Sequence, residues 1–220
     1  EEAGGLVREL ARLGREGPSL VLAAEAGLAA ARYYLAAGDS SSALDALKRG
    51  LAAAQEAGAA GAAAVREASL LLGATMLADG RLGEAVEYAG LAEREAQEAG
   101  DRLGALRAGS LLASCHFLEG RLTRAGECAA GGLALAAAMG QRDEEVFLGF
   151  LNARVRFLLG DYEGCSVSLQ RCRCLAEIYR MSAAEPVLDA WIARSLVYAG
   201  SAAAGAARLE RLEPSREVLL

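Results

Sequence analysis

The sequence has little proline, and its basic residues are outnumbered by acidic ones. Only three prolines occur among 220 residues, which leaves long segments free to form uninterrupted helices. Twenty-three lysines and arginines stand against 29 aspartates and glutamates, for a net charge of −6. Nonspecific binding to nucleic acid requires a basic face, so we expect no nucleic-acid partner.

Long runs of large apolar residues are also missing, although 54% of the residues are hydrophobic. Much of that share is alanine, and arginine or glutamate interrupts every apolar segment. A membrane-spanning helix needs about 20 predominantly apolar residues, so we expect a soluble protein that does not insert into a membrane.

The chain opens on Glu1-Glu2, without methionine, and shows no signal peptide. We therefore expect a piece of a longer chain, located in the cytoplasm. A periplasmic location stays open, because an export signal would have been removed with the missing start.

Residues that carry catalytic or metal chemistry are few. His116, the only histidine, stands four residues before a repeated glycine, in a column with Tyr34, Met76 and Leu196, which predicts a core residue. The number of cysteines is odd, and their spacing is not that of a disulfide framework, which favours a protein of a reducing compartment. They are Cys115, Cys128, Cys165, Cys172 and Cys174. The sequence predicts no catalytic residue, no metal and no cofactor, so we expect a protein that is not an enzyme.

What the sequence does contain is a long internal repeat, marked by "ADGRLGEA", "LEGRLTRA" and "LLGDYEGC". Each phrase has a glycine followed five residues later by a small residue. These anchor glycines recur at nearly equal spacing, and they are Gly38, Gly80, Gly120, Gly160 and Gly200. Apolar residues recur at intervals of three and four on both sides of each anchor, as in amphipathic helices.

The periodicity predicts two helices per repeat, with a turn at the anchor. First helices are expected near 19–37, 61–79, 101–119, 141–159 and 184–199. Second helices are expected near 41–57, 82–98, 123–139, 162–180 and 202–212. Asp101 is a predicted N-cap, and Gly100 and Gly140 suit helix ends.

Two columns of small residues indicate how the helices pair. Seven residues before each anchor stand Ala31, Gly73, Ala113, Ala153 and Ala193. Five residues after each anchor stand Ala43, Ala85, Ala125, Cys165 and Gly205. Small residues that face each other across a turn allow two helices to approach closely. The sequence therefore predicts antiparallel helix hairpins that pack along these columns.

This combination of a small residue in the first helix, a turn glycine and a small residue five positions on resembles the tetratricopeptide repeat family, in its longer variety. The resemblance implies an all-α, right-handed α-solenoid. It also implies five hairpins, near 19–58, 59–100, 101–140, 141–182 and 183–212. Residues 1–18 are expected to be the remnant second helix of a preceding repeat, and residues 213–220 the start of a following segment.

In such a solenoid the first helices line a concave groove that binds partners. Positions 13, 10, six and three before each anchor share the inward stripe of these helices. The guanidinium group of arginine can donate two parallel hydrogen bonds to a carboxylate, and aromatic rings add apolar contact area. The predicted groove residues are Arg32, Arg154, Arg194, Phe147, Phe150, Trp191, Ser110 and Ser114. The structural alternative is that these arginines pair with glutamates of adjacent repeats.

The sequence thus predicts a non-catalytic scaffold or adaptor for protein–protein interaction. It would bind a peptide or partner domain in the groove, with an acidic or C-terminal carboxylate segment favoured, and so assemble a larger complex. The alternative function is a regulatory sensor module of a larger signalling or transcription-regulating protein, with a peptide or small ligand in the same groove.

Overall fold

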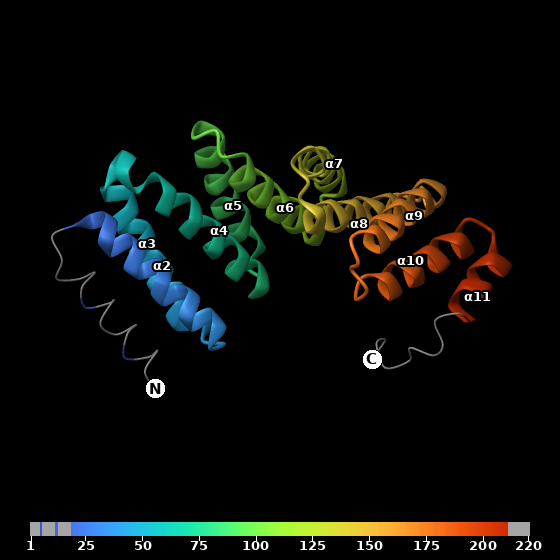
Figure 1. Ribbon diagram of the computed structural model, residues 1–220, viewed down its shortest axis with the longest axis horizontal. Coiled ribbons are helices and arrows are strands. Elements are labelled where there is room, and N and C mark those ends of the chain that lie inside the picture. The colour runs from blue at the N-terminus through green and yellow to red at the C-terminus, as the bar shows by residue number, and fades with distance from the viewer. Residues whose placement is uncertain (1–4, 6–11, 13–18, 211–220) are drawn as a thin grey trace. The chain divides into compact units, whose positions relative to one another are not determined.

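The computed structural model describes residue 5, residue 12 and residues 19–210, and the predicted segments at 1–18 and 213–220 lie outside the continuous range. Within residues 19–210 the structure contains helices and no strand (Figure 1). The elements are α2 (Leu20–Ala36), α3 (Ser40–Glu56), the short 3₁₀ helix η1 (Gly58–Gly61), α4 (Ala62–Ala78), α5 (Leu82–Glu98), α6 (Arg102–Leu118), α7 (Leu122–Met139), α8 (Arg142–Leu158), α9 (Tyr162–Ile178), α10 (Glu185–Tyr198) and α11 (Ala202–Glu210). The all-α prediction is confirmed, and the helix ends lie within two residues of those predicted.

The chain divides into two compact units, Glu1–Cys115 and His116–Leu220, which we call unit 1 and unit 2. In unit 1, α2, α3, α4 and α5 pack consecutively, each on the next. In unit 2 the same holds for α7, α8, α9, α10 and α11. The sequence shows no break in its register at the boundary, which falls inside α6.

The anchor glycines end the first helices by adopting left-handed backbone conformations. Their φ angles lie between 75° and 86°, a region that L side chains rarely adopt. At the Gly80 turn, the N–H of Arg81 donates to the carbonyl of Met76 at 2.8 Å, which closes the helix in a Schellman motif. The turn glycines therefore set the reversal between the helices of each hairpin.

The second helices end in the same way, with one exception. Gly58, Gly100 and Gly140 have φ angles of 59°, 67° and 65° at this position. The fourth equivalent position is Arg180, whose φ of 59° makes it the one described non-glycine residue in the left-handed region. An L side chain is strained there, and the sequence did not reveal it, because the helix was predicted to continue through residue 180.

Both columns of small residues are buried, as the hairpin prediction requires. All ten members fall in the buried class, and eight of them are alanine or cysteine with no exposed surface. A Cβ added to Gly73 would lie 3.3 Å from the carbonyl oxygen of Ala85, its partner across the turn. At the last hairpin, a Cβ on Gly205 would lie 2.8 Å from the carbonyl oxygen of Ala193. The two columns therefore meet in these two hairpins.

A second crossing, farther from the turn, is a feature that the sequence analysis missed. Gly27 of α2 meets Gly50 of α3, and a Cβ added to Gly27 would lie 2.8 Å from the Cα of Gly50. The equivalent pair in unit 2 is Gly149 and Cys172, where the added Cβ would lie 2.6 Å from Sγ. The repeat register thus keeps two close contacts in each of these hairpins, one near the turn and one farther out.

By length and composition alone, one described segment, Gly58–Ala78, is apolar enough to cross a membrane, with a mean hydropathy of 1.2. The segment joins η1 to α4, and α4 contributes Leu72 and Met76 to the core of unit 1, each without exposed surface. It also carries Arg66, which forms an ion pair with Asp101 at 3.4 Å. Alanine raises the hydropathy of this helix, so a buried core helix meets the same criterion.

Candidate partner-binding site

Arg154 lies on α8 with its guanidinium among three aromatic rings. Its Cζ is 4.4 Å from the ring centre of Phe117, 5.4 Å from that of Trp191 and 5.7 Å from that of Phe150. Such cation–π contacts contribute about 0.5–2 kcal/mol, more when water is excluded. Burial lowers the pKa of Arg154 from its ordinary value, yet arginine stays protonated in proteins. The site therefore holds a positive charge against apolar surface.

Arg194, one repeat later on α10, also lies among three aromatic rings. Its Cζ is 4.9 Å from the ring centre of Phe157, 5.1 Å from that of Trp191 and 5.9 Å from that of Tyr198. Both guanidinium groups therefore contact the indole of Trp191. We call Arg154, Arg194 and Trp191 the Arg–Trp cluster.

No carboxylate among the described residues forms an ion pair with Arg154 or Arg194, and the buried Nε of Arg154 has no hydrogen-bond acceptor there. The nearby acidic residues of α10 pair with other arginines. Arg173 contacts Glu185 at 2.7 Å and Asp189 at 3.2 Å, and Arg208 donates from Nε to Asp189 at 2.9 Å. The cluster consequently presents two positive charges that this part of the chain leaves uncompensated.

The equivalent arginine of unit 1 has a different environment. Arg32 forms an ion pair with Glu67 of the next repeat, as the structural alternative predicted. Glu67 stands 13 residues before its anchor glycine. The same position in the repeats of unit 2 holds Phe147 and Val187. The position that neutralises Arg32 from the next repeat therefore holds the apolar Val187 in the repeat after Arg154.

Phe147 and Val187 line an apolar pocket between α8 and α10, with a volume of about 240 Å³. Its lining consists of Asp143, Val146, Phe147, Phe150, Met181, Ala184, Val187 and Leu188. Phe147 is 44% exposed and Val187 is 40% exposed, so the pocket opens to solvent. Phe150 also packs edge-on against Trp191, with ring centres 5.8 Å apart, so one residue both lines the pocket and contacts the Arg–Trp cluster.

The structure thus brings five of the predicted groove residues together in unit 2: Arg154, Arg194, Phe147, Phe150 and Trp191. The other three lie in unit 1. Ser110 is only 6% exposed, so it offers little surface, and the hydroxyl of Ser114 donates to the carbonyl of Ser110 at 2.9 Å.

The sequence analysis missed three aromatic contributors, Phe117, Phe157 and Tyr198. Their signal was present, because Phe117 and Phe157 stand three residues before their anchors, on the predicted inward stripe. Only the packing shows that their rings meet the guanidinium groups.

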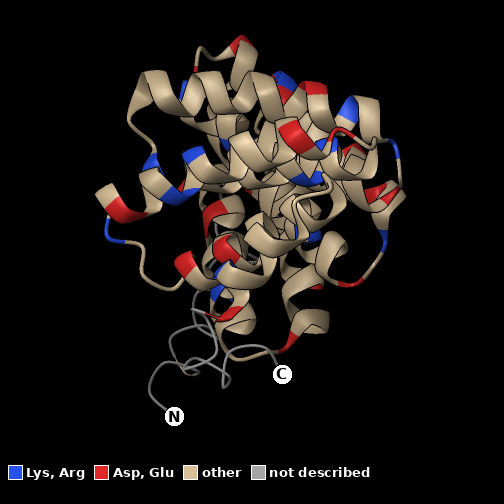
Figure 2. Ribbon diagram, turned by 90° about the vertical axis from the view of Figure 1, so that its right-hand side faces the viewer, with Lys and Arg blue, Asp and Glu red and all other residues tan. Residues whose placement is uncertain are grey.

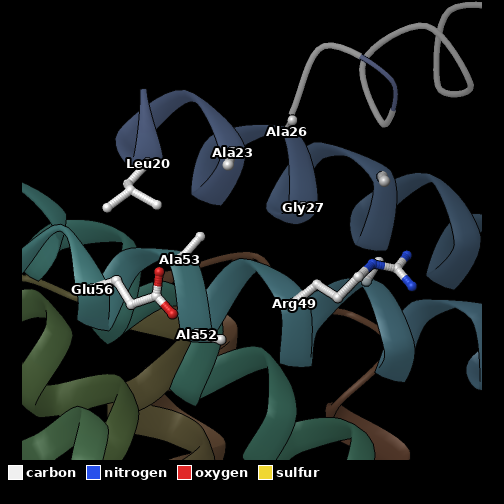
Figure 3. A pocket seen from close by; sticks show the side chains of 10 residues that line it. Leu20, Ala23, Ala26, Gly27, Arg49, Ala52, Ala53 and Glu56 are labelled. Carbon is white, nitrogen blue, oxygen red and sulfur yellow. The ribbon is translucent and has the colours of Figure 1, made fainter. Parts of the chain in front are cut away.

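Other surfaces of the described chain offer less specific chemistry. A hollow of about 330 Å³ between α2 and α3 is lined mainly by alanine, with Arg49 and Glu56 at its edges (Figure 3). Charged residues of both signs are scattered over the helices rather than gathered in one basic region (Figure 2). The Arg–Trp cluster is distinguished by its unpaired charges, not by a general excess of them.

His116, Cys165 and Cys172 are held in packed surroundings, whereas Cys174 is exposed. His116 is 7% exposed, as the core prediction requires, and its Nδ1 lies 3.3 Å from a carboxylate oxygen of Glu119. Burial raises the pKa of the Cys165 and Cys172 thiols to about 11. Within the described ranges, no three histidine, cysteine or acidic side chains are grouped so that they could hold a metal ion.

No family model matches the sequence, and no curated protein matches it either. Solved structures do match. BtubC (BKLC) from P. vanneervenii superimposes with a TM-score of 0.81 at 17% identity, over 99% of this chain and 89% of that one. A protein of Podosopora anserina assigned as a kinesin light chain, with nearly identical TPR-like repeats, gives a TM-score of 0.70 at 16% identity, over 86% of this chain and 92% of that one.

The chain has a tetratricopeptide-like repeat fold. This identifies the architecture that the repeat register predicted. Aspartyl phosphate phosphatase F from Bacillus subtilis is also similar, with a TM-score of 0.72 and 13% identity over 90% of this chain. The tetratricopeptide-like chain spans only 52% of that phosphatase. At these identities the likeness concerns the fold alone.

Proposed function

We propose that this chain is a non-catalytic scaffold that binds an acidic peptide or C-terminal carboxylate of a partner protein and so assembles a larger complex. The observation that carries the proposal is the pair of guanidinium groups on Trp191, which have no carboxylate from the described chain. An ionised carboxylate accepts two parallel hydrogen bonds from an arginine fork, so a partner acid supplies the missing counter-charge.

The surroundings favour a peptide over a small ion. Aromatic rings flank both arginines, and a buried aromatic residue beside an arginine is typical of the positions that contribute most to protein interfaces. The rings also reduce the contact of the guanidinium groups with water, which strengthens a charge-assisted hydrogen bond. The odd number of cysteines, without the spacing of a disulfide framework, supports our proposal that the protein is cytoplasmic.

Trp191 is the only tryptophan of the chain, so its fluorescence reports binding at the cluster directly. The probe is an alanine–serine octapeptide that ends in two aspartates, compared with the same peptide carrying asparagines. We expect the aspartate peptide to change the fluorescence at a concentration at least tenfold lower.

Arg154→Ala combined with Arg194→Ala should remove this difference between the peptides. Helical circular dichroism should stay nearly unchanged, and the melting temperature should fall only modestly, because each arginine loses its ring contacts but no ion pair with another described residue. Arg32→Ala is the matched control, since Arg32 occupies the same register position but pairs with Glu67. Unchanged peptide binding by the double variant would refute the proposal, and a large loss of stability would assign the arginines a structural role.

A further inference from the structure

The pocket that adjoins the Arg–Trp cluster has a chemistry of its own. Its walls are the side chains of Val146, Phe147, Phe150, Met181 and their apolar neighbours, and Asp143 is its single ionisable residue. An engineered apolar cavity of about 150 Å³ holds a benzene molecule, so about 240 Å³ accommodates a leucine or phenylalanine side chain. Burial of such a side chain removes apolar surface from water and so favours binding.

We propose that the partner peptide inserts an apolar side chain into this α8–α10 pocket, about three residues from the carboxylate held by Arg154 and Arg194. The inference rests on the proposed function and specifies its ligand: an extended segment with one apolar anchor and one acidic group.

The spacing follows from the helix geometry. Phe147 and Arg154 are seven residues apart on α8, which is about 10 Å at a rise of 1.5 Å per residue. On α10, Leu188 and Arg194 are six residues apart, or about 9 Å. An extended peptide advances about 3.3 Å per residue, so three residues span either distance.

The charges fix which end of the peptide carries the acid. Asp143 lines the pocket in the first turn of α8, and Arg154 follows it by eleven residues on the same helix. A carboxylate on that side of the anchor would meet like charge, whereas one on the other side meets the two arginines. The recognised segment is therefore acidic on one flank of the apolar residue and neutral or basic on the other.

The test uses fluorescein-labelled octapeptides of alanine and serine with one leucine and one aspartate. The leucine and the aspartate are separated by one to five positions, in both orders. The protein in the assay is the 220-residue chain. We expect the tightest binding at a separation of three in one of the two orders, at least tenfold tighter than the matched peptide with alanine in place of leucine. A second aspartate beyond the leucine should weaken that binding.

Phe147→Ser should abolish the advantage of leucine and leave the aspartate-dependent binding in place, because the arginines are untouched. Val167→Ser is the matched control, since Val167 is a more exposed apolar residue, 68% exposed, on α9 outside the pocket. The inference is wrong if leucine does not increase the affinity of the peptide, or if the increase is the same at every leucine–aspartate separation. It is also wrong if Phe147→Ser leaves the increase unchanged. Aspartate and asparagine peptides that bind equally would contradict the proposed function itself, and an absence of binding by every peptide would contradict both.

Discussion

Units 1 and 2 share one repeat register but differ in what the register positions hold. In unit 1 the helix crossing at Gly27 and Gly50 is backbone against backbone, and Arg32 is neutralised by Glu67. In unit 2 the equivalent crossing is Gly149 against the thiol of Cys172, and the equivalent arginines lie on aromatic rings. The comparison shows that the register determines where helices pack, while residues outside the packing columns determine whether the arginines of a face have a carboxylate partner.

The largest expected effect separates the two crossings. Gly27→Ala should lower the free energy of unfolding by about 3 kcal/mol, because the new Cβ would press on the backbone of Gly50 and Ala46, which cannot move aside. Gly149→Ala should lower the free energy of unfolding by less, since the new Cβ would meet the side chain of Cys172 rather than backbone. Adding Cys172→Ala to that variant should restore part of the lost stability. Urea titrations of the single and double variants measure both changes in the free energy of unfolding. Equal losses of stability at Gly27 and Gly149 would contradict the difference between the two crossings.

The positions of Cys165 and Cys172 are a further difference, since the equivalent positions in the hairpins of unit 1 hold alanine or glycine, and the buried thiol of unit 1, Cys115, lies elsewhere. Burial raises the pKa of the Cys165 and Cys172 thiols from 9.0 to about 11, so their reactive thiolate is about a hundredfold scarcer at pH 8. Mass spectrometry after brief alkylation should find the exposed Cys174 modified long before either of them.

The same pKa shift predicts a pH dependence of stability. Because the folded-state pKa lies above the unfolded one, the contribution of these thiols is complete below about pH 9 and is lost as the pH rises from about 9 to 11. A chain with Cys165→Ala and Cys172→Ala should therefore lose less stability over that window than the parent. Parallel losses in the two proteins would show that the thiols are not responsible.

Val187→Glu would introduce into unit 2 the glutamate that neutralises the arginine of unit 1. It places a glutamate at the register position of Glu67, within the pocket and one repeat after Arg154. We expect the new carboxylate to pair with Arg154 and to reduce the affinity for the aspartate peptide about tenfold, with Val187→Gln as the uncharged control. If both variants bind as the parent does, the missing glutamate is not what distinguishes the two faces.

The smallest expected effect concerns the helix ends. Arg180→Gly should raise the free energy of unfolding by about 1 kcal/mol, because glycine adopts the left-handed conformation of this residue without strain. Gly140→Ala, at the equivalent position one repeat earlier, should lower it by a similar amount. Thermal unfolding of the two variants provides the measurement, and a loss of stability in Arg180→Gly would contradict the assignment of strain.

The sequence predicted the helices and their turns well because their signals are local and repeated. Turn glycines, small columns such as Ala31 with Ala43, and apolar periodicity all recur once in every repeat. The Gly27–Gly50 crossing escaped notice because its column also contains Ser69 and Asp189, which hide the pattern of small residues. Arg180 escaped for a similar reason, since no glycine marks the end of its helix.

The sequence by itself determined the helices, their turns and the stripe on which Arg154 and Arg194 stand, because each follows from spacing along one chain. It left open whether those arginines are paired, since an ion pair depends on which side chain the next repeat brings within reach. Only the tertiary structure decided that Glu67 reaches Arg32, that Glu185 and Asp189 turn toward Arg173 and Arg208, and that Trp191 lies against both remaining guanidinium groups. The physical reason is that packing contacts repeat with the register, whereas charge compensation depends on individual side chains in space.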